Sequence, residues 1–298
     1  ADEVLALVEA AGTSGYSLYG IVSVGSNEGR GFLRGVPVLG DIANLREYVL
    51  AYDVETLVVA TAPDKTHTLF HVLRPLRYAG VQIMDYVALY EELGTEIPID
   101  HIDDEWLMHA AMNSSRIHIR QIKRVMDLGA SMIGLIVLSP LVVLAAIAIK
   151  LTSPGPVLYR QERVGRDGRV YTLLKLRTMR QNAEAESGAV WATAGDRRIT
   201  PVGRFLRKWR IDEIPQLVNV LRAEMSLVGP RPERPEFVST LKHSLPFYQE
   251  RLMVAHGITG WAQVKFPYAT SIEATKRKFQ FDLYYIKHMS PIMDLRII

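Results

Sequence analysis

The sequence predicts an α/β protein in two parts: a truncated Rossmann-like domain, then a mainly helical domain with a β-hairpin and one long apolar helix. Three observations predict this. Helical and strand patterns alternate over residues 1–100, an uncharged apolar segment covers 128–149, and an Asp-Gly pair at 167–168 separates two strand-like stretches. The chain of 298 residues is long enough for two domains. We place the second domain at 117–298, after a polar connection over 101–116.

The first domain is predicted from three helices and three strands that alternate along the chain. The helical patterns cover 2–11, 41–52 and 66–80, and the strand patterns cover 17–24, 55–61 and 81–86. Strands separated by helices are typical of a parallel, Rossmann-like sheet. The chain opens on a helix and does not begin with Met, so we expect that a first strand and its loop have been removed.

A dinucleotide site is not predicted in this domain. Gly25, Gly29 and Gly31 follow a strand, but their spacing is not that of the dinucleotide fingerprint, and they lead into a stretch without helical character. We therefore favour a scaffolding or regulatory role over nucleotide binding. The domain could also support a homodimer.

Composition excludes several classes of protein. The chain has no cysteine, which excludes disulfides and thiolate metal sites. Its net charge of +3 is too small to indicate a nucleic-acid-binding protein. No signal-peptide pattern is found at the N-terminus, which is an acidic, amphipathic stretch.

The apolar segment allows three interpretations: a buried core helix, a helix that spans a membrane, and a helix that enters a membrane and returns. Leu128–Ile149 contains 22 residues without a charge, and a helix of that length measures about 33 Å, enough to cross the hydrocarbon core. Basic residues flank it on both sides: Arg116, Arg120, Lys123 and Arg124 before it, and Lys150, Arg160, Arg163, Arg166 and Arg169 after it.

We predict a re-entrant helix over 125–150, broken at Ser139 and Pro140, in a monotopic membrane domain. Pro140 has no N–H, so the carbonyl of Ile136 loses its helical partner, and the Ser139 hydroxyl can cover part of the freed backbone. Basic flanks favour the same side of the bilayer. They would also attract anionic headgroups or a lipid-linked phosphate.

Cationic side chains gather after the apolar segment. The predicted hairpin around Asp167 and Gly168 places Lys175 and Arg177 on one face of its second strand. Arg231 lies between two prolines, which stiffen the backbone and suit bidentate contact with a phosphate. The alternative for Lys175 and Arg177 is a cationic face exposed to solvent.

Two adjacent acids follow a basic helix. Thr200 and Pro201 predict the helix start, and four basic residues are expected on one of its faces: Arg204, Arg207, Lys208 and Arg210. Asp212 and Glu213 come just before Pro215, which would open the next helix. Helix dipoles and arginines are expected to keep the acids ionised. Such a pair could hold Mg²⁺ against a diphosphate; helix capping with surface ion pairs is the alternative.

The C-terminal region offers weaker signals. Trp261 and Gln263 could pack or contact substrate. Residues 276–288 form an amphipathic helix whose aromatic side chains could be core, membrane-interface anchors or both: Phe279, Phe281, Tyr284 and Tyr285.

From about Ile117 to the C-terminus, the chain resembles the bacterial sugar transferases that act as polyprenyl-phosphate phosphoglycosyl transferases. The motifs that carry the resemblance are KRVMDLGAS, LSPL, SPGPVLYRQERVG, LLKLRTM, WRIDEIPQLVNVLRAEMSLVGPRPERPEF, GITGWAQV and FDLYYIKH. Residues 1–100 resemble the cytoplasmic domain of the long members, which usually begin with transmembrane helices. One departure is the sequence Asp-Glu-Ile-Pro, where Asp-Glu-Leu-Pro is commoner.

The resemblance implies an enzyme at the cytoplasmic face of the bacterial inner membrane. It would transfer a hexose-1-phosphate from a UDP-sugar to undecaprenyl phosphate and release UMP, the first membrane step of exopolysaccharide, O-antigen or capsule synthesis. Asp212 would be the nucleophile that forms an aspartyl-phosphosugar, accompanied by Glu213 and Mg²⁺. The positions that match other functional residues of the family are Lys175, Arg207, Arg231 and Asp282.

We therefore expect Asp212 and Glu213 as catalytic and metal-binding residues, with glucose or galactose as the sugar. Five cations are expected to bind substrate phosphates: Lys175, Arg177, Arg207, Arg210 and Arg231. Two other functions stay open: a non-catalytic membrane scaffold in polysaccharide assembly, which would not need the acid pair, and a nucleotide-sensing regulator, which would need a glycine-rich loop.

Overall fold

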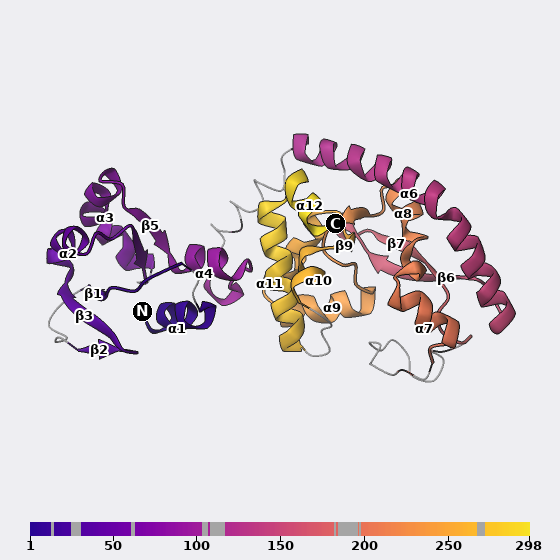
Figure 1. Ribbon diagram of the computed structural model, residues 1–298, viewed down its shortest axis with the longest axis horizontal. Coiled ribbons are helices and arrows are strands. Elements are labelled where there is room, and N and C mark those ends of the chain that lie inside the picture. Colours follow the sequence, from indigo (N-terminus) through magenta and orange to yellow (C-terminus); the bar gives the residue numbers. More distant parts are fainter. Residues whose placement is uncertain are drawn as a thin grey trace. The chain divides into compact units, whose positions relative to one another are not determined.

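The computed structural model of the chain forms two compact units, Ala1–Ile102 and Asp103–Ile298, which are described separately (Figure 1). The residues described are 1–12, 15–24, 31–60, 63–102, 107, 117–181, 183, 196, 198–266 and 272–298. Gly25, Gly29 and most of the predicted connection over 101–116 lie outside these ranges.

The first unit is a mixed α/β structure with two small sheets. In one sheet, β1 (Ile21–Ser23) runs parallel to β3 (Val36–Asp41), which pairs antiparallel with β2 (Phe32–Leu33). In the other, β4 (Thr56–Val59) runs parallel to β5 (Gln82–Asp85). The helices are α1 (Asp2–Ala11), η1 (Ile42–Asn44), α2 (Leu45–Ala51), α3 (Pro63–Tyr78), α4 (Tyr86–Gly94) and η2 (Ile99–His101).

The predicted alternation of helices and strands is confirmed in this unit. Helices α2 and α3 bury their apolar stripes in a core with the strands, made of Leu45, Val49, Leu69, Leu73, Leu76 and Val81. The sequence did not indicate β3 or α4. Within the described residues the strands form two sheets, whereas a single parallel sheet was expected.

The second unit is built on a hairpin and a set of helices. The helices are α6 (Ile117–Thr152), α7 (Pro201–Lys208), η4 (Ile211–Glu213), α8 (Gln216–Leu221), α9 (Pro235–Ser244), η5 (Tyr248–Met253), α10 (Trp261–Lys265), α11 (Ile272–His288) and α12 (Pro291–Ile297). A short parallel pair, β8 (Ser226–Val228) with β9 (Gly257–Thr259), joins the segments before and after α9.

The predicted hairpin is confirmed. Strand β6 (Leu158–Val164) pairs antiparallel with β7 (Val170–Leu176) across η3 (Arg166–Gly168), where Asp167 has a φ of 58°. Side chains alternate along a strand, so Tyr171, Leu173 and Lys175 share one face. The first two pack against Val220 of α8. Lys175 is therefore directed toward the segment that leads into α8.

The basic helix begins as predicted but ends earlier. The Thr200 hydroxyl accepts a hydrogen bond from the N–H of Gly203 at 2.9 Å, and Pro201 is the first helical residue. Helix α7 ends at Lys208, and Arg210 has a left-handed φ of 56°. The prediction that Arg210 continues the basic face of this helix is wrong, because the chain turns there to place Ile211 in the core with Leu206.

Helix α6 is long and apolar enough to cross a membrane, and only 11% of its most apolar window is buried. The interpretation as a buried core helix is therefore wrong. The buried residues form a stripe along the helix, namely Lys123, Asp127, Ser131, Ala145 and Ile149. Large apolar side chains are exposed elsewhere along it, among them Met132, Ile133, Ile136, Val137, Val143, Leu144 and Ile147. This exposed surface indicates association with a membrane.

The predicted break at Ser139 and Pro140 is not found, because α6 is one helix from Ile117 to Thr152. Figure 1 shows α6 as a continuous, curved helix, and its helical assignment runs through Pro140. The Ser139 hydroxyl donates a hydrogen bond to the Ile136 carbonyl at 2.9 Å, as the sequence predicted. Because this bond satisfies the carbonyl that Pro140 cannot reach, the chain bends without leaving the helical conformation.

We expect Gly203→Ala to destabilise the second unit. A Cβ at this position of α7 would overlap the Thr178 carbonyl oxygen, a backbone atom that has no rotamer to escape into. Overpacking of this kind costs about 1–3 kcal/mol. Thermal unfolding of the detergent-solubilised chain measures the effect. Gly129→Ala on α6 is the matched control, since its Cβ would meet no atom within 4 Å; equal unfolding temperatures for the two variants would contradict the prediction.

Candidate active site

The predicted acid pair lies in a short turn between two helices. Asp212 and Glu213 belong to η4, which connects α7 to α8, and both are buried. Ile211, the first residue of the turn, packs in a core with Ala145 and Ile149 of α6. The core contact fixes the turn, and the two carboxylates project from it beside a helix that carries the exposed apolar surface.

Three cations from three different segments surround Glu213. Its Oε1 atom accepts hydrogen bonds from Lys175 Nζ at 3.1 Å and from Arg231 Nη2 at 2.8 Å. Its Oε2 atom accepts one from Arg210 Nη1 at 3.1 Å. Burial raises the pKa of Glu213, but Arg231, Lys175 and Arg210 together hold it far below its ordinary range. Glu213 is therefore a permanent anion that gathers these cations.

Asp212 has a different environment, although it is the next residue along the chain. Among the residues that the structure describes, its carboxylate accepts no hydrogen bond from another side chain. Burial raises the pKa of Asp212, and the charges of Lys175 and Arg207 reverse only part of that rise. The cations thus outweigh desolvation at Glu213, whereas desolvation outweighs them at Asp212. The expectation that both acids stay ionised is confirmed for Glu213 and stays a prediction for Asp212.

Lys175 has an unusual pKa for a lysine. Burial lowers the pKa of its ammonium to about 8, and Arg231 adds to that effect, against the opposing pull of Glu213 and Asp212. Its side chain is 18% exposed. The positive charge of Lys175 is therefore lost as the pH rises through about 8.

The other two predicted cations lie further out. Arg207 donates through Nε to the Thr178 hydroxyl at 2.8 Å and acts on Asp212 through its charge. Arg177 instead donates to the carbonyls of Pro154 and Ser153, at 2.7 and 2.8 Å. The structure thus places Arg177 at the segment that follows α6, where it bonds to the main chain and makes no contact with Glu213.

A second polar network fixes the loop that carries Arg231. Arg251 donates through Nη2 to the Arg231 carbonyl at 2.8 Å, through Nε to Asp282 at 2.8 Å, and through Nη1 to the Tyr248 hydroxyl at 2.7 Å. Asp282 is buried, and its ion pair with Arg251 connects it to the backbone of Arg231.

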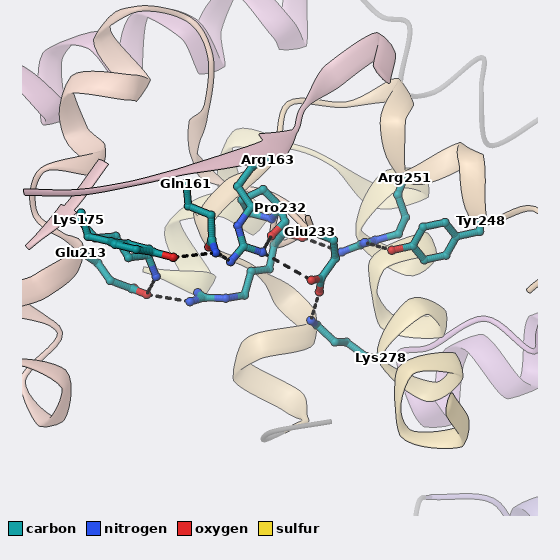
Figure 2. A network of polar contacts seen from close by, with 11 residues as sticks. Gln161, Arg163, Lys175, Glu213, Pro232, Glu233, Tyr248, Arg251 and Lys278 are labelled. Carbon is teal, nitrogen blue, oxygen red and sulfur yellow. Dashed lines mark hydrogen bonds and ion pairs between the residues drawn. The ribbon is translucent and has the colours of Figure 1, made fainter. Parts of the chain in front are cut away.

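The same loop is held from its other side. Arg163 of β6 donates to the Pro232 carbonyl at 3.0 Å, and Glu233 pairs with Arg163 at 3.6 Å and with Lys278 of α11 at 3.3 Å. Figure 2 shows these contacts as one chain that connects the Lys175–Glu213 pair with the Arg251–Tyr248 pair. No site role was predicted for Arg163, Glu233 or Arg251; Arg163 was named only as a basic residue flanking the apolar segment, and Glu233 lies in the proline-rich loop around Arg231.

The remaining C-terminal candidates make packing contacts. Trp261 stacks on Tyr284 with ring centroids 5.9 Å apart, and Gln263 donates to the Ile258 carbonyl at 3.1 Å. Phe279, Phe281 and Tyr285 are buried, so the aromatic side of α11 belongs to the core.

The acid pair suits Mg²⁺ only in part. Within the described residues, no group of three or more His, Cys, Asp or Glu side chains is arranged to hold a metal ion. Mg²⁺ commonly uses one or two carboxylates, with the remaining ligands from substrate phosphates and water. Asp212 fits that role as a single ligand. Glu213 already accepts hydrogen bonds from three cations, so a metal ion there would share its oxygens with Lys175, Arg210 and Arg231, and its role as a metal ligand stays a prediction.

The arrangement can bind and attack a phosphate ester. Lys175, Arg210 and Arg231 form a cluster of positive charge around a buried carboxylate, and a second, weakly hydrogen-bonded carboxylate lies beside them. Cations placed around developing phosphate charge are what phosphoryl transfer needs most, and a carboxylate can act as its nucleophile.

Comparison with known proteins gives consistent matches. Residues 118–298 match the model of the family described as bacterial sugar transferase. The chain is 42% identical over 220 residues to the UDP-N-acetylgalactosamine-undecaprenyl-phosphate N-acetylgalactosaminephosphotransferase of Aeromonas hydrophila, covering 74% of this chain and 51% of that protein. It is 32% identical over 276 residues to the UDP-glucose:undecaprenyl-phosphate glucose-1-phosphate transferase of Xanthomonas campestris, covering 89% of this chain and 56% of that protein.

A further relative is named for the same activity as the second. The UDP-glucose:undecaprenyl-phosphate glucose-1-phosphate transferase of Caulobacter vibrioides is 42% identical over 185 residues, covering 61% of this chain and 69% of that protein. The chain spans about half the length of the Aeromonas and Xanthomonas relatives. Because the family model matches more than half of the chain, and covers the acid pair and its cations, the protein belongs to the bacterial sugar transferase family.

Proposed function

We propose that this chain transfers a sugar-1-phosphate from a UDP-sugar to undecaprenyl phosphate, with Asp212 as the nucleophile. The observation that carries the proposal is the division of the acid pair, in which Glu213 binds three cations while Asp212 accepts no side-chain hydrogen bond within the described residues. The relatives are named as transferases of a sugar phosphate from a UDP-sugar to undecaprenyl phosphate, which supports this reaction.

In the first step, an Asp212 carboxylate oxygen attacks the phosphorus that bears the sugar. The bond from this phosphorus to the bridging oxygen breaks, UMP leaves with the electron pair, and an aspartyl-phosphosugar forms. In the second step, a phosphate oxygen of undecaprenyl phosphate attacks the same phosphorus and releases the Asp212 carboxylate. Splitting the transfer in this way lets one nucleophile serve a soluble donor and a lipid acceptor in turn.

The cations have a direct part in both steps. Lys175, Arg210 and Arg231 lie within hydrogen-bond distance of Glu213 and are placed to bind the diphosphate oxygens beside it. Arg207 adds positive charge on the side of Asp212. When bound at Asp212, Mg²⁺ would neutralise further phosphate charge.

The position of the site suits a lipid acceptor. The turn that carries Asp212 shares its core with Ala145 and Ile149 of α6, the helix with the exposed apolar surface. A membrane-bound acceptor would therefore present its phosphate close to the nucleophile. We place the reaction at the cytoplasmic face of the inner membrane, where UDP-sugars are made, as a first step of envelope polysaccharide synthesis.

The first prediction tests the nucleophile. We expect Asp212→Asn to lower UMP release from UDP-sugars by about 10⁴-fold or more, because the amide cannot form the acyl phosphate. UMP release is measured over a panel of UDP-glucose, UDP-galactose and UDP-N-acetylgalactosamine, which also identifies the sugar. Asp167→Asn, in the exposed hairpin turn, is the matched control and should keep full activity.

A trapping experiment completes this test. Incubating the wild-type chain with a UDP-sugar labelled in the sugar-bound phosphate, without lipid acceptor, should leave label on the protein. Asp212→Asn should carry none. Normal turnover by Asp212→Asn would overturn the assignment of Asp212 as the nucleophile. The nucleophile would then be another group, or the chain would be a scaffold for a different enzyme.

The second prediction concerns pH. The pKa of Lys175 is lowered to about 8 from an ordinary value near 10.5, so its charge is present below pH 8 and is lost as the pH rises through 8. We expect UMP release to fall above about pH 8. Lys175→Arg keeps its charge throughout this range, so the fall should be absent from that variant. A wild-type profile that stays flat to pH 9.5 would contradict a role for this charge.

The third prediction concerns the disposition of α6. We propose that the helix enters and leaves the same leaflet; the basic residues at both ends and the overall curvature of α6 support this. The chain has no cysteine, so a single cysteine at Ile117 or at Leu151, both exposed, gives an unambiguous label site. Both variants should react with an impermeant thiol reagent in inverted membrane vesicles. Neither variant should react with it in spheroplasts. Labelling from opposite sides would show a spanning helix.

A further inference from the structure

A cationic cavity lies away from the acid pair. Its volume is about 180 Å³, and it is lined by Arg120, Lys123, Arg124, Asp127, Arg166, Ala223, Met225, Val254, Ala255 and Met289. Counted from Arg120, the next three residues of the lining lie three, four and seven positions further along α6, so the four share one face of that helix. The proposed reaction uses none of these residues.

The charges of this cavity are only partly neutralised. Lys123 pairs with Asp294 of α12, and Arg166 pairs at 3.2 Å with Asp167, an exposed acid outside the lining. Arg124 donates to the carbonyls of Val220 and Leu221, at 2.6 and 2.9 Å, which are uncharged acceptors. Asp127, the one acid in the lining, accepts from the Leu227 N–H at 3.1 Å. Four basic residues therefore line the cavity with one acid, which favours an anionic ligand.

The cavity is separated from the acid pair by the length of α8. Arg124 bonds to the carbonyls at the C-terminal end of that helix, whereas Glu213 precedes its N-terminal end. Helix α8 has six residues, so its two ends are about 9 Å apart along the axis. A phosphate in the cavity would therefore not occupy the proposed donor site.

Two helices that border the cavity also expose apolar side chains. On α6, Ile122 and Val125 are exposed within the same turns that carry the basic residues. On α12, which is tied to Lys123, Ile292 and Leu295 are exposed. The uncharged part of α6 begins at Leu128, directly after Asp127. The cavity thus lies where an apolar, membrane-associated surface begins, at the level where phospholipid headgroups are found.

The lining combines two kinds of surface. The basic side chains come from α6 and the hairpin turn, whereas Met225, Val254 and Met289 supply apolar surface. A ligand that carries a phosphate next to apolar groups matches both. We infer that this cavity binds the phosphate of an anionic phospholipid headgroup, with Arg120 and Arg166 in contact with the phosphate and the methionines against the apolar part of the lipid. The inference does not depend on the proposed reaction.

The test is a binding measurement on the detergent-solubilised chain. Dihexanoyl-phosphatidylglycerol, used below its micelle concentration, is titrated and binding is followed by calorimetry and by the unfolding temperature. We expect saturable binding that Arg120→Gln and Arg166→Gln each weaken about fivefold, the change that corresponds to about 1 kcal/mol per cation near a lipid surface. Lys123 and Arg124 are left intact, because their bonds to Asp294 and to α8 hold the fold.

Three controls make the measurement decisive. Arg169→Gln removes the same charge from an exposed residue next to the hairpin turn, outside the cavity lining, and should bind like the wild type. Dihexanoyl-phosphatidylcholine, which has no net charge, should bind much more weakly. Equal binding of the two lipids, or equal loss in Arg169→Gln and Arg166→Gln, would overturn the inference. Binding of inorganic phosphate with the affinity of the lipid would also overturn it, since the site would then take a free anion.

Discussion

The interaction on which the site depends is the set of ion pairs around Glu213. Its carboxylate joins Lys175 of the hairpin, Arg210 of the turn after α7, and Arg231 of the proline-rich loop. These cations repel one another, so the three segments can meet only if an anion lies between them. A buried carboxylate that loses its partners is typically destabilising by about 3–5 kcal/mol. The pairs therefore hold the segments together and keep positive charge concentrated where the proposed reaction would bind the diphosphate of the donor.

The geometry of η4 separates the two acids. A 3₁₀ turn has three residues per turn, so neighbouring side chains point about 120° apart. Glu213 faces the cations, Ile211 faces the core shared with α6, and Asp212 faces a third direction in which no side chain donates to it within the described residues. Adjacent carboxylates thus receive opposite pKa shifts, which is how one site can hold both a fixed anion and a reactive one.

Local signals predicted the parts of this structure that local chemistry determines. The Asp167–Gly168 pair specified the hairpin, Thr200 and Pro201 specified the start of α7, and Ser139 specified how the chain passes Pro140. The predictions that failed concern side chains whose partners lie in distant segments of the chain. Arg177 bonds to carbonyls 23 and 24 residues away, and Arg251 pairs with an acid 31 residues away. No spacing in the sequence indicates such partners.

Helix α6 is attached to the rest of the second unit at two points, and one of them is next to the acid pair. Near its start, Lys123 pairs with Asp294, and Asp127 accepts a hydrogen bond from Leu227 of β8. In its second half, Ala145 and Ile149 share a core with Ile211, the residue next to Asp212. Because the helix is fixed to the catalytic unit on both sides of Pro140, it cannot tilt without moving the turn. The depth at which α6 settles in the lipid would therefore determine the height of Asp212 above the membrane.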